Sequence, residues 1–290
     1  MHPRPAVLAV DIGATKMAAA VVGGDGTMHW RDQVPTPRSD DGEAVWAALA
    51  TLVARREGAP ALCGIGCGGP TGSDADHMSP LNIPGWVDFP LRRLLAEETG
   101  LPAWLDNDAK ALALGEGVLG AARGEANYLS MVVSSGVGGG IVLDGRLLDG
   151  AAANAGHIGH VVVEPDGRAC VCGGRGCLEA EASGLSIQAI TGAPAAEAGP
   201  AVVERTGTLV GRAVASVANL LDLGLATVAG SVALGFGDPF FAAARAELRR
   251  RAGLPYSRGC RIVAGGLGAD GPLVGAAAVA WRGAGLLGRA

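Results

Sequence analysis

Residues 6–22 read AVLAVDIGATKMAAAVV, and residues 128–143 read YLSMVVSSGVGGGIVL. Each stretch consists of two apolar runs of strand length joined by a short turn that contains glycine, which is typical of a β-hairpin. Helix-like segments follow each hairpin along the chain. Two strand-rich segments of the same build, each followed by helices, predict a duplicated α/β architecture.

The length and composition agree with a two-lobed protein. A chain of 290 residues with 49% hydrophobic residues exceeds the usual size of a single hydrophobic core, so two domains are expected. The net charge of -5 does not favour nucleic acid as a partner. No uninterrupted apolar run of membrane-spanning length and no signal peptide is visible, which predicts a cytoplasmic protein without a membrane partner.

Several elements can be placed from local signals. Asp41 is expected to open a helix whose apolar face carries Val45, Leu49, Leu52 and Val53. A second helix is expected to begin at Asp88 as its cap and to stop at Gly100. Residues 103–107, AWLDN, predict a strand, and a helix follows near Asp108.

The turns of the two hairpins have the composition of phosphate-binding loops. In residues 11–16, DIGATK, small residues let backbone N–H groups approach an anion, while Thr15 offers a hydroxyl and Lys16 a positive charge. Residues 134–140, SSGVGGG, form a second such turn. Neither turn has the P-loop or the dinucleotide-binding pattern, and an ordinary hairpin turn is the alternative for each.

Two clusters of polar residues stand out. In residues 106–108, DND, Asp and Asn at a strand-to-helix junction are typical of a helix cap. Three cysteines and a histidine, Cys170, Cys172, Cys177 and His160, have the composition of a structural Cys3His zinc site. A redox pair is the alternative, although such pairs prefer C-x-x-C and the closest pair here is C-x-C.

The order of these stretches resembles that of the ROK family of sugar kinases and sugar-responsive repressors. The matching stretches are AVDIGATK, GIGCGGPTG, LNIPGW, LDNDAKALALGE, SSGVGGGIVLDG, NAGHIGH, CVCGGRGCLEAEASG and VANLLDLGLATVAGS, and they cover roughly residues 6–280. The resemblance implies a two-lobed, ribonuclease-H-like fold of the actin-like ATPase superfamily with a cleft between the lobes. Residues 1–107, completed by a C-terminal helix at about 273–290, would form one lobe, and residues 108–272, with a zinc-binding segment at 160–177, the other.

The resemblance also implies roles for individual residues. Asp108 corresponds to the catalytic base. Asp11, at a strand end beside the first glycine turn, would orient Mg²⁺ through water, and an ordinary turn residue is the alternative. The residues implied to bind the sugar are Gly69, Asn82, Asn107, His157, His160 and Glu179. Those implied to hold ATP, besides Asp11, are Gly13, Thr15, Lys16, Ser135 and Gly136. The zinc ligands would be His160, Cys170, Cys172 and Cys177, and zinc would be structural.

Three places depart from the family pattern: His157, Ser134–Ser135 and residues 229–231, AGS. His157 occupies the place of a sugar-binding glutamate, and an imidazole offers one donor and one acceptor where a carboxylate only accepts. The expected function is an ATP-dependent hexokinase acting on the 6-hydroxyl, with glucose as the default substrate and a homodimer as the expected assembly. The alternative is a kinase of a modified hexose of the kanosamine, N-acetylmannosamine or N-acetylglucosamine type.

A third hypothesis is a sugar-responsive transcriptional regulator, since the resembling family includes such proteins. These regulators carry an N-terminal helix-turn-helix of some tens of residues, whereas ten residues precede Asp11 in this sequence. The sequence therefore favours an enzyme that binds a small-molecule sugar over a regulator that binds nucleic acid.

Overall fold

The computed structural model describes residues 3–72, 76–80 and 83–287, which form two compact units. The first unit contains the described residues up to Gly120, the segment Leu148–Ala155, and the described residues from Leu267 onward. The second unit contains Ala121–Leu147 and Gly156–Gly266. No helix in the described part of the chain is long and apolar enough to cross a membrane.

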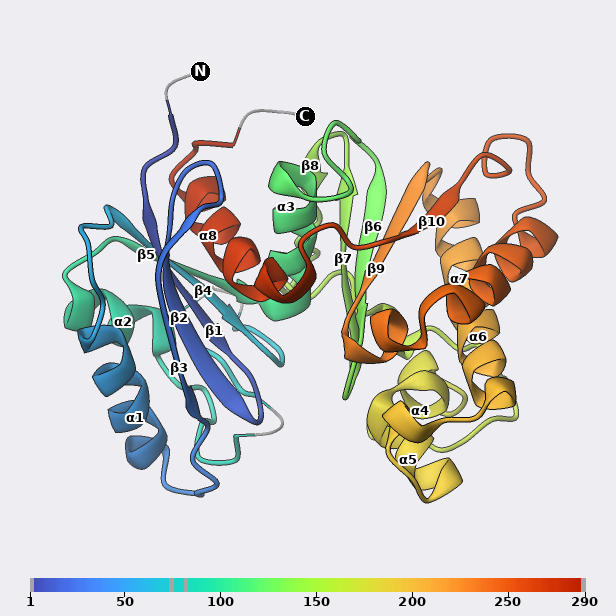
Figure 1. Cartoon of the computed structure of the whole chain (residues 1–290), viewed down its shortest axis with the longest axis horizontal. Helices are drawn as coiled ribbons and strands as arrows, with labels where there is room; N and C mark the ends of the chain where they lie inside the picture. Colours follow the sequence, from blue (N-terminus) through green and yellow to red (C-terminus); the bar gives the residue numbers. More distant parts are fainter. Residues whose placement is uncertain (1–2, 73–75, 81–82, 288–290) are drawn as a thin grey trace. The chain divides into compact units, whose positions relative to one another are not determined.

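The first unit contains a five-stranded mixed sheet with the order β3-β2-β1-β4-β5 (Figure 1). β1 pairs antiparallel with β2 and parallel with β4, β2 pairs antiparallel with β3, and β4 pairs parallel with β5. The strands are β1 (Val7–Ile12), β2 (Lys16–Val22), β3 (Met28–Pro35), β4 (Leu62–Cys67) and β5 (Ala103–Asn107). The predicted hairpin at residues 6–22 is therefore present as β1 and β2.

Helices cover both faces of this sheet. α1 and α2 lie on one face, and α3 and α8 lie on the other (Figure 1). The helices are α1 (Gly42–Ala54), α2 (Leu91–Thr99), α3 (Asp108–Leu119) and α8 (Gly271–Gly283), with a 3-10 turn, η3 (Gly268–Asp270), before α8. The predicted apolar face of α1 is fully buried, because Val45, Leu49, Leu52 and Val53 all lie in the core.

The predicted helix caps had different outcomes. Asp41 caps α1, where its Oδ1 accepts a hydrogen bond from the Glu43 N–H at 3.0 Å. The prediction that Asp88 caps the next helix is wrong. α2 begins at Leu91, its N-cap is Pro90, and Asp88 adopts a left-handed backbone with φ 50°. Gly100 ends α2 as predicted, in the left-handed conformation that glycine adopts without strain.

α8 packs between the first sheet and α3. A Cβ at Gly64 in β4 would overlap the carbonyl oxygen of Ala276 in α8, so only glycine lets the helix lie this close to the strand. On the other side of α8, a Cβ at Gly115 in α3 would lie 3.0 Å from the backbone nitrogen of Gly275. This packing includes α3 in the first unit, whereas the boundary predicted at residues 107 and 108 separates α3 from it.

The second unit repeats the strand pattern of the first. Its sheet has the order β10-β9-β6-β7-β8, with β6-β7-β8 antiparallel and β6-β9-β10 parallel. The strands are β6 (Tyr128–Val133), β7 (Val137–Leu143), β8 (Arg146–Leu147), β9 (Leu225–Ala229) and β10 (Arg261–Ala264). Reading β6 to β10 in place of β1 to β5 gives the same topology, which confirms the predicted duplicated α/β architecture.

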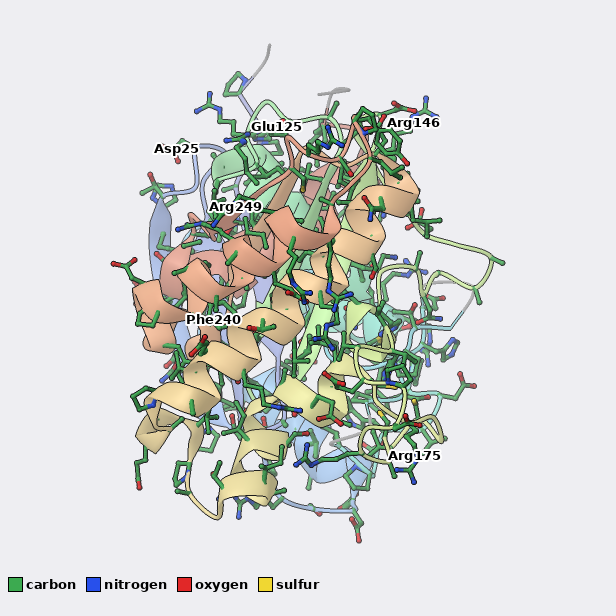
Figure 2. All side chains as sticks on the ribbon, turned by 90° about the vertical axis from the view of Figure 1, so that its right-hand side faces the viewer. Asp25, Glu125, Arg146, Arg175, Phe240 and Arg249 are labelled. Atoms are coloured by element: carbon green, nitrogen blue, oxygen red, sulfur yellow. The ribbon has the colours of Figure 1, made fainter. Side chains whose placement is uncertain are left out.

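The helical part of the second unit packs mainly through α6 and α7. The helices are α4 (Leu178–Ala182), α5 (Gly184–Thr191), α6 (Pro200–Leu221) and α7 (Ser231–Arg251), with 3-10 turns η1 (Ile158–His160) and η2 (Ala195–Glu197). Figure 2 shows Phe240 and Arg249 on α7. Phe240 is fully buried in the core of this unit, and Arg249 is exposed. α7 is kinked at Gly237, which has φ 63° and stands two residues before Pro239.

Candidate active site and metal-ligand cluster

Two carboxylates of the first unit lie at the same edge of the sheet, near the ends of parallel strands. Asp11 is the second-to-last residue of β1, and Asp108 is the first residue of α3, directly after β5. β4 lies between β1 and β5 in the sheet. A Cβ at Gly68 would lie 3.4 Å from Oδ2 of Asp108, and a Cβ at Gly66 would lie 3.8 Å from Oδ1 of Asp11. Glycine at these two positions keeps the space beside both carboxylates free of side chains.

Burial changes the acidity of both carboxylates. It raises the pKa of Asp11 to about 7, the negative charge of Asp108 adds to this rise, and Lys16 and Arg31 oppose it. Burial also raises the pKa of Asp108, and the backbone N–H of Ala109 opposes that rise by donating to Oδ1 at 2.8 Å. A carboxylate whose affinity for protons is raised in this way is a better proton acceptor.

Asn107 uses its side chain to hold local structure. Its Oδ1 accepts hydrogen bonds from the N–H groups of Ala109 and Lys110 at 3.0 and 3.3 Å, which makes it the N-cap of α3. Its Nδ2 donates to the carbonyl oxygen of Gly69 at 3.1 Å. The helix-cap interpretation of the DND cluster thus applies to Asn107, whereas Asp108 is the half-buried first residue of α3. The roles predicted for Asn107 and Gly69 in sugar binding stay predictions.

A small hollow of about 100 Å³ lies next to these groups. It is lined by Ile12, Gly13, Ala14, Gly68, Gly69, Pro80 and Ile83. The hollow therefore joins the first glycine turn to the loop after β4. Asn82, which was predicted to bind the sugar, lies outside the described residues.

The first glycine turn is exposed and held by backbone bonds. Gly13 N–H donates to the Lys16 carbonyl at 3.0 Å, and the Thr36 hydroxyl donates to the Gly13 carbonyl at 2.7 Å. Ala14, Thr15 and Lys16 are exposed. The predicted contacts of Thr15 and Lys16 with phosphate stay predictions.

The second glycine turn lies against Glu179 in the second unit. Ser134 N–H donates to the Gly136 carbonyl at 2.9 Å, and Ser135 is exposed. A Cβ at Gly136 would lie 3.3 Å from Oε1 of Glu179. Glu179, in the first turn of α4, accepts a hydrogen bond from the Val137 N–H at 2.5 Å. Burial raises the pKa of Glu179, and the Val137 N–H and the charge of His160 oppose the rise.

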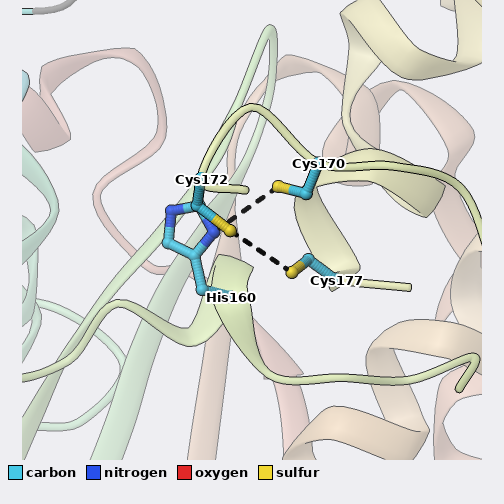
Figure 3. A group of neighbouring side chains, drawn as sticks. All are labelled: His160, Cys170, Cys172 and Cys177. Atoms are coloured by element: carbon cyan, nitrogen blue, oxygen red, sulfur yellow. Dashed lines mark hydrogen bonds between the residues drawn. The ribbon is translucent and has the colours of Figure 1, made fainter. Parts of the chain in front are cut away.

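The four predicted metal ligands converge. One ligand atom from each of His160, Cys170, Cys172 and Cys177 lies within 4.8 Å of the others (Figure 3). Cys170 Sγ is 3.7 Å from His160 Nδ1, and Cys172 Sγ is 3.7 Å from Cys177 Sγ. Tetrahedral zinc with Zn–S bonds of about 2.3 Å separates two sulfurs by about 3.8 Å. The cluster therefore fits a Cys3His zinc ion in both donor set and spacing.

Glu181 provides a second anchor for the cysteine segment. Its carboxylate is buried and accepts hydrogen bonds from the N–H of Arg168 at 2.6 Å and from its guanidinium at 2.8 Å. The guanidinium of Arg205, on α6, donates to the same carboxylate at 2.5 Å. Glu181 was not predicted from the sequence as a functional residue. Its position four residues after Cys177 does not indicate that Arg168 and Arg205 bind it.

His157 lies at the start of η1 and is exposed. The centroid of its ring is 6.2 Å from that of His160, so this departure from the family pattern lies next to the metal-ligand cluster. Its predicted contact with the sugar stays a prediction.

A model of the ROK family matches residues 7–282. The chain belongs to the ROK family. A curated relative, the N-acetylmannosamine kinase of Haemophilus influenzae, is 36% identical over 286 residues, which cover 93% of each protein. The predicted family is therefore confirmed, and a relative that is itself a named kinase supports the predicted phosphotransferase class.

Two solved ROK structures have the same fold. The ROK hexokinase from Thermus thermophilus is 35% identical, with a TM-score of 0.80 and coverage of 97% of this chain and 99% of that one. A ROK family glucokinase from Streptomyces griseus, in complex with glucose and AMPPNP, is 28% identical, with a TM-score of 0.83 and coverage of 96% and 99%. This ROK protein thus has kinases as relatives in both sequence and structure.

Proposed function

We propose that this ROK protein is an ATP-dependent kinase that phosphorylates the 6-hydroxyl of a hexose carrying a nitrogen substituent, with N-acetylmannosamine as the first candidate. The observation that carries the proposal is the 36% identity with an N-acetylmannosamine kinase over 93% of both chains. This supports the modified-hexose alternative better than the glucose default. Glucose remains the second candidate, because the glucokinase with glucose bound has the same fold.

The carboxylates of the first unit supply the proposed chemistry. Asp108 would accept the proton of the attacking hydroxyl, since it is half-buried at the start of α3 and burial raises the pKa of its carboxylate. Asp11 would help to hold Mg²⁺ through water, because oxygen ligands suit this ion and a cation would offset the charge that Asp11 and Asp108 place close together. Bound Mg²⁺ would neutralise charge on the transferring phosphoryl group.

The remaining predicted residues would bind substrate and fix its orientation. Thr15 and Lys16 in the first turn, with Ser135 and Gly136 in the second, would donate to phosphate oxygens. Glu179 and His157 would bind hydroxyl or amide groups of the sugar. Zinc held by His160 and the three cysteines would be structural, since all four positions are filled by protein ligands.

The proposal is tested by measuring ADP release from ATP with a panel of N-acetylmannosamine, N-acetylglucosamine, glucosamine, mannose and glucose. The wild-type protein is expected to have its highest kcat/KM with an N-acetylated hexose. Asp108→Asn is expected to lower kcat by about 10²- to 10⁴-fold, the range that general base catalysis supplies.

The matched control is Asp40→Asn, which removes an exposed carboxylate of the same unit and should leave kcat unchanged. A higher kcat/KM for glucose than for every nitrogen-bearing sugar would overturn the assigned substrate class. Substantial turnover by Asp108→Asn would overturn the assigned base.

A further inference from the structure

A buried lysine of the first unit lies two residues after the proposed base. Lys110 is 2% exposed. Its Nζ lies 2.9 Å from Asp106 Oδ1, 3.2 Å from Asp149 Oδ1 and 2.9 Å from the carbonyl oxygen of Ala153. These three acceptors match the three N–H donors of an ammonium group, so the buried charge is fully satisfied.

Arg282 closes this arrangement into a ring of alternating charges. Arg282, on α8, donates to Asp106 Oδ2 at 3.3 Å and to Asp149 Oδ2 at 2.5 Å. Each aspartate therefore binds Lys110 with one oxygen and Arg282 with the other. We call these residues the four-charge ring: Asp106, Lys110, Asp149 and Arg282. It carries two positive and two negative charges and joins β5, α3 and α8 to the segment Leu148–Ala155.

Lys110 and Arg282 favour the charged form of both aspartates in the ring. Burial would raise the pKa of Asp149, but the hydrogen bond and charge of Arg282, together with Lys110, bring it below its ordinary value. Burial raises the pKa of Asp106, and Lys110, the N–H of Asn107 and Arg282 oppose the rise. A buried ion pair is sensitive to loss of one partner, because the other charge is then left uncompensated.

The segment Leu148–Ala155, which we call the strap, is held by the ring and in turn holds the loop after β4. The Ala155 N–H donates to the Asp149 carbonyl at 2.9 Å, which closes the strap on itself. Ala153 adopts φ 60°, a left-handed conformation that is unfavourable for alanine, and its carbonyl is the one that Lys110 binds. The Lys110 contact thus compensates for a strained backbone.

Asn154, near the C-terminal end of the strap, binds the backbone of Thr71. The Asn154 side chain accepts a hydrogen bond from the Thr71 N–H at 3.3 Å and donates to the Thr71 carbonyl at 3.2 Å. Asn107, directly before Asp108, donates to the Gly69 carbonyl at 3.1 Å. Two asparagine side chains therefore hold residues 69–71. Asn154 belongs to the strap, which contains Asp149 of the four-charge ring. Asn107 precedes α3, which contains Lys110 of the ring.

We infer that Lys110, Asp149 and Asn154 are positioning residues that fix the loop Gly69–Thr71 for sugar binding. The inference rests on the proposed function, because the sugar site of such a kinase would include Gly69, which the family resemblance implies as a sugar-binding residue. The side chains do not touch substrate; they act through the strap and the Thr71 backbone. The Thr71 hydroxyl is buried and has no hydrogen-bond partner within the described part of the chain. The Thr71 backbone is held by the Asn154 side chain and by an isolated β-bridge with Met78.

The test combines a structural and a kinetic measurement on the full chain. In Lys110→Met and in Asn154→Ala, hydrogen exchange at the Thr71 amide is expected to be faster than in the wild type. KM for the best sugar should rise, with kcat/KM lower by about 10- to 100-fold, the size of effect that misplacement by about 1 Å produces. KM for ATP should stay unchanged. A general loss of folded protein would lower the apparent kcat and would leave KM for the sugar unchanged, so the rise in KM for the sugar separates the two causes.

The double variant and a matched control complete the experiment. Lys110→Met combined with Asn154→Ala should lose no more than the more severe single variant, because both act on the same strap. Arg93→Gln breaks an exposed ion pair with Glu97 elsewhere in the first unit and should change neither measurement. If Lys110→Met does not fold, the half-buried Asn154 carries the comparison through Asn154→Ala.

Unchanged exchange at Thr71 in the variants would overturn the inference, as would faster exchange with an unaltered KM for the sugar. Failure of the proposed function is a separate result: the wild type would phosphorylate none of the sugars. Hydrogen exchange would then still decide whether Lys110 and Asn154 position Thr71.

Discussion

At the scale of single residues, the close approach of Asp11 and Asp108 is the most consequential feature of the first unit. Each carboxylate is buried enough to raise its pKa, and the charge of Asp108 raises the pKa of Asp11 further. Placing two such groups together opposes folding at neutral pH, which is a common property of sites that bind a cation.

This gives a pH-dependent prediction for the ligand-free protein. The pKa of Asp11 is about 7 in the folded state against an ordinary value of 3.8, so the folded state binds the proton more tightly than the unfolded chain. The stability from that proton is present below pH 3.8 and is lost as the pH rises toward 7. Asp11→Asn removes this loss, so its Tm relative to wild type should increase between pH 4.5 and 8.

The measurement is a pair of thermal unfolding series across that pH range, with Asp40→Asn as the exposed control. A constant difference in Tm between Asp11→Asn and wild type at every pH would contradict the raised pKa.

At the scale of elements, the cysteine segment is fixed in two ways. The side chains of His160 and three cysteines converge at one end, and the buried carboxylate of Glu181 binds Arg168 and Arg205 at the other. α4 follows this segment directly and carries Glu179 in its first turn. Loss of one anchor should therefore loosen the position of Glu179 without removing α4.

Metal removal tests the first anchor. A strong chelator, or Cys172→Ser, is expected to lower Tm by about 5–10 °C, the shift that a loss of about 2–3 kcal/mol produces in a domain of this size. KM for the sugar should rise in parallel. Elemental analysis should find one zinc per wild-type chain. Cys260→Ser, at a half-buried cysteine outside the cluster, is the control and should retain the metal; no zinc in the wild type would refute the assignment.

The contact between β4 and α8 gives a second prediction at this scale. Gly64→Ala would place a Cβ against the Ala276 carbonyl and 3.1 Å from the Ala280 Cβ, so the helix must move away from the sheet. Overpacking of this kind costs about 1–3 kcal/mol and should lower Tm. Gly253→Ala, whose Cβ would meet no atom within 4 Å, should change stability by no more than about 0.5 kcal/mol. Equal Tm values for the two variants would contradict the close packing.

Local sequence signals predicted much of the secondary structure for a clear reason. Strands such as β1 and β6 are short apolar runs next to glycine turns, and α1 has a capped apolar face, so each is encoded within its own residues. Asp88 was mistaken for a cap because Pro90, two residues later, provides the helix start instead. The presence of an Asp shortly before an apolar helix does not show whether that Asp or a later residue is the N-cap.

The candidate site was only partly predictable. The converging metal ligands could be recognised because their spacing limits the geometry. The four-charge ring could not, because Asp106 and Arg282 meet only through the packing of α8 against the first sheet. Lys110 was visible only as one of two lysines among 23 basic residues, a count that gives no information about partners.

At the scale of the whole molecule, each unit is built around the same five-stranded topology, but the two are assembled differently along the chain. The second unit is formed by residues that follow one another with a single excursion, Leu148–Ala155, into the first. The first unit requires three separate pieces of chain, and its sheet is covered by α8, which lies beyond all of the second unit in sequence.

The position of α8 has a consequence for biosynthesis. A ribosome that has translated β1 to β5 and α3 has not yet made the helix that covers β1, β4 and β5, so the apolar face of this sheet stays uncovered while the second unit is being translated. At roughly 5–20 residues per second, this wait lasts on the order of 10 s. During that time the nascent first unit exposes apolar surface of the kind that chaperones bind. The second unit is therefore expected to complete its fold before the first.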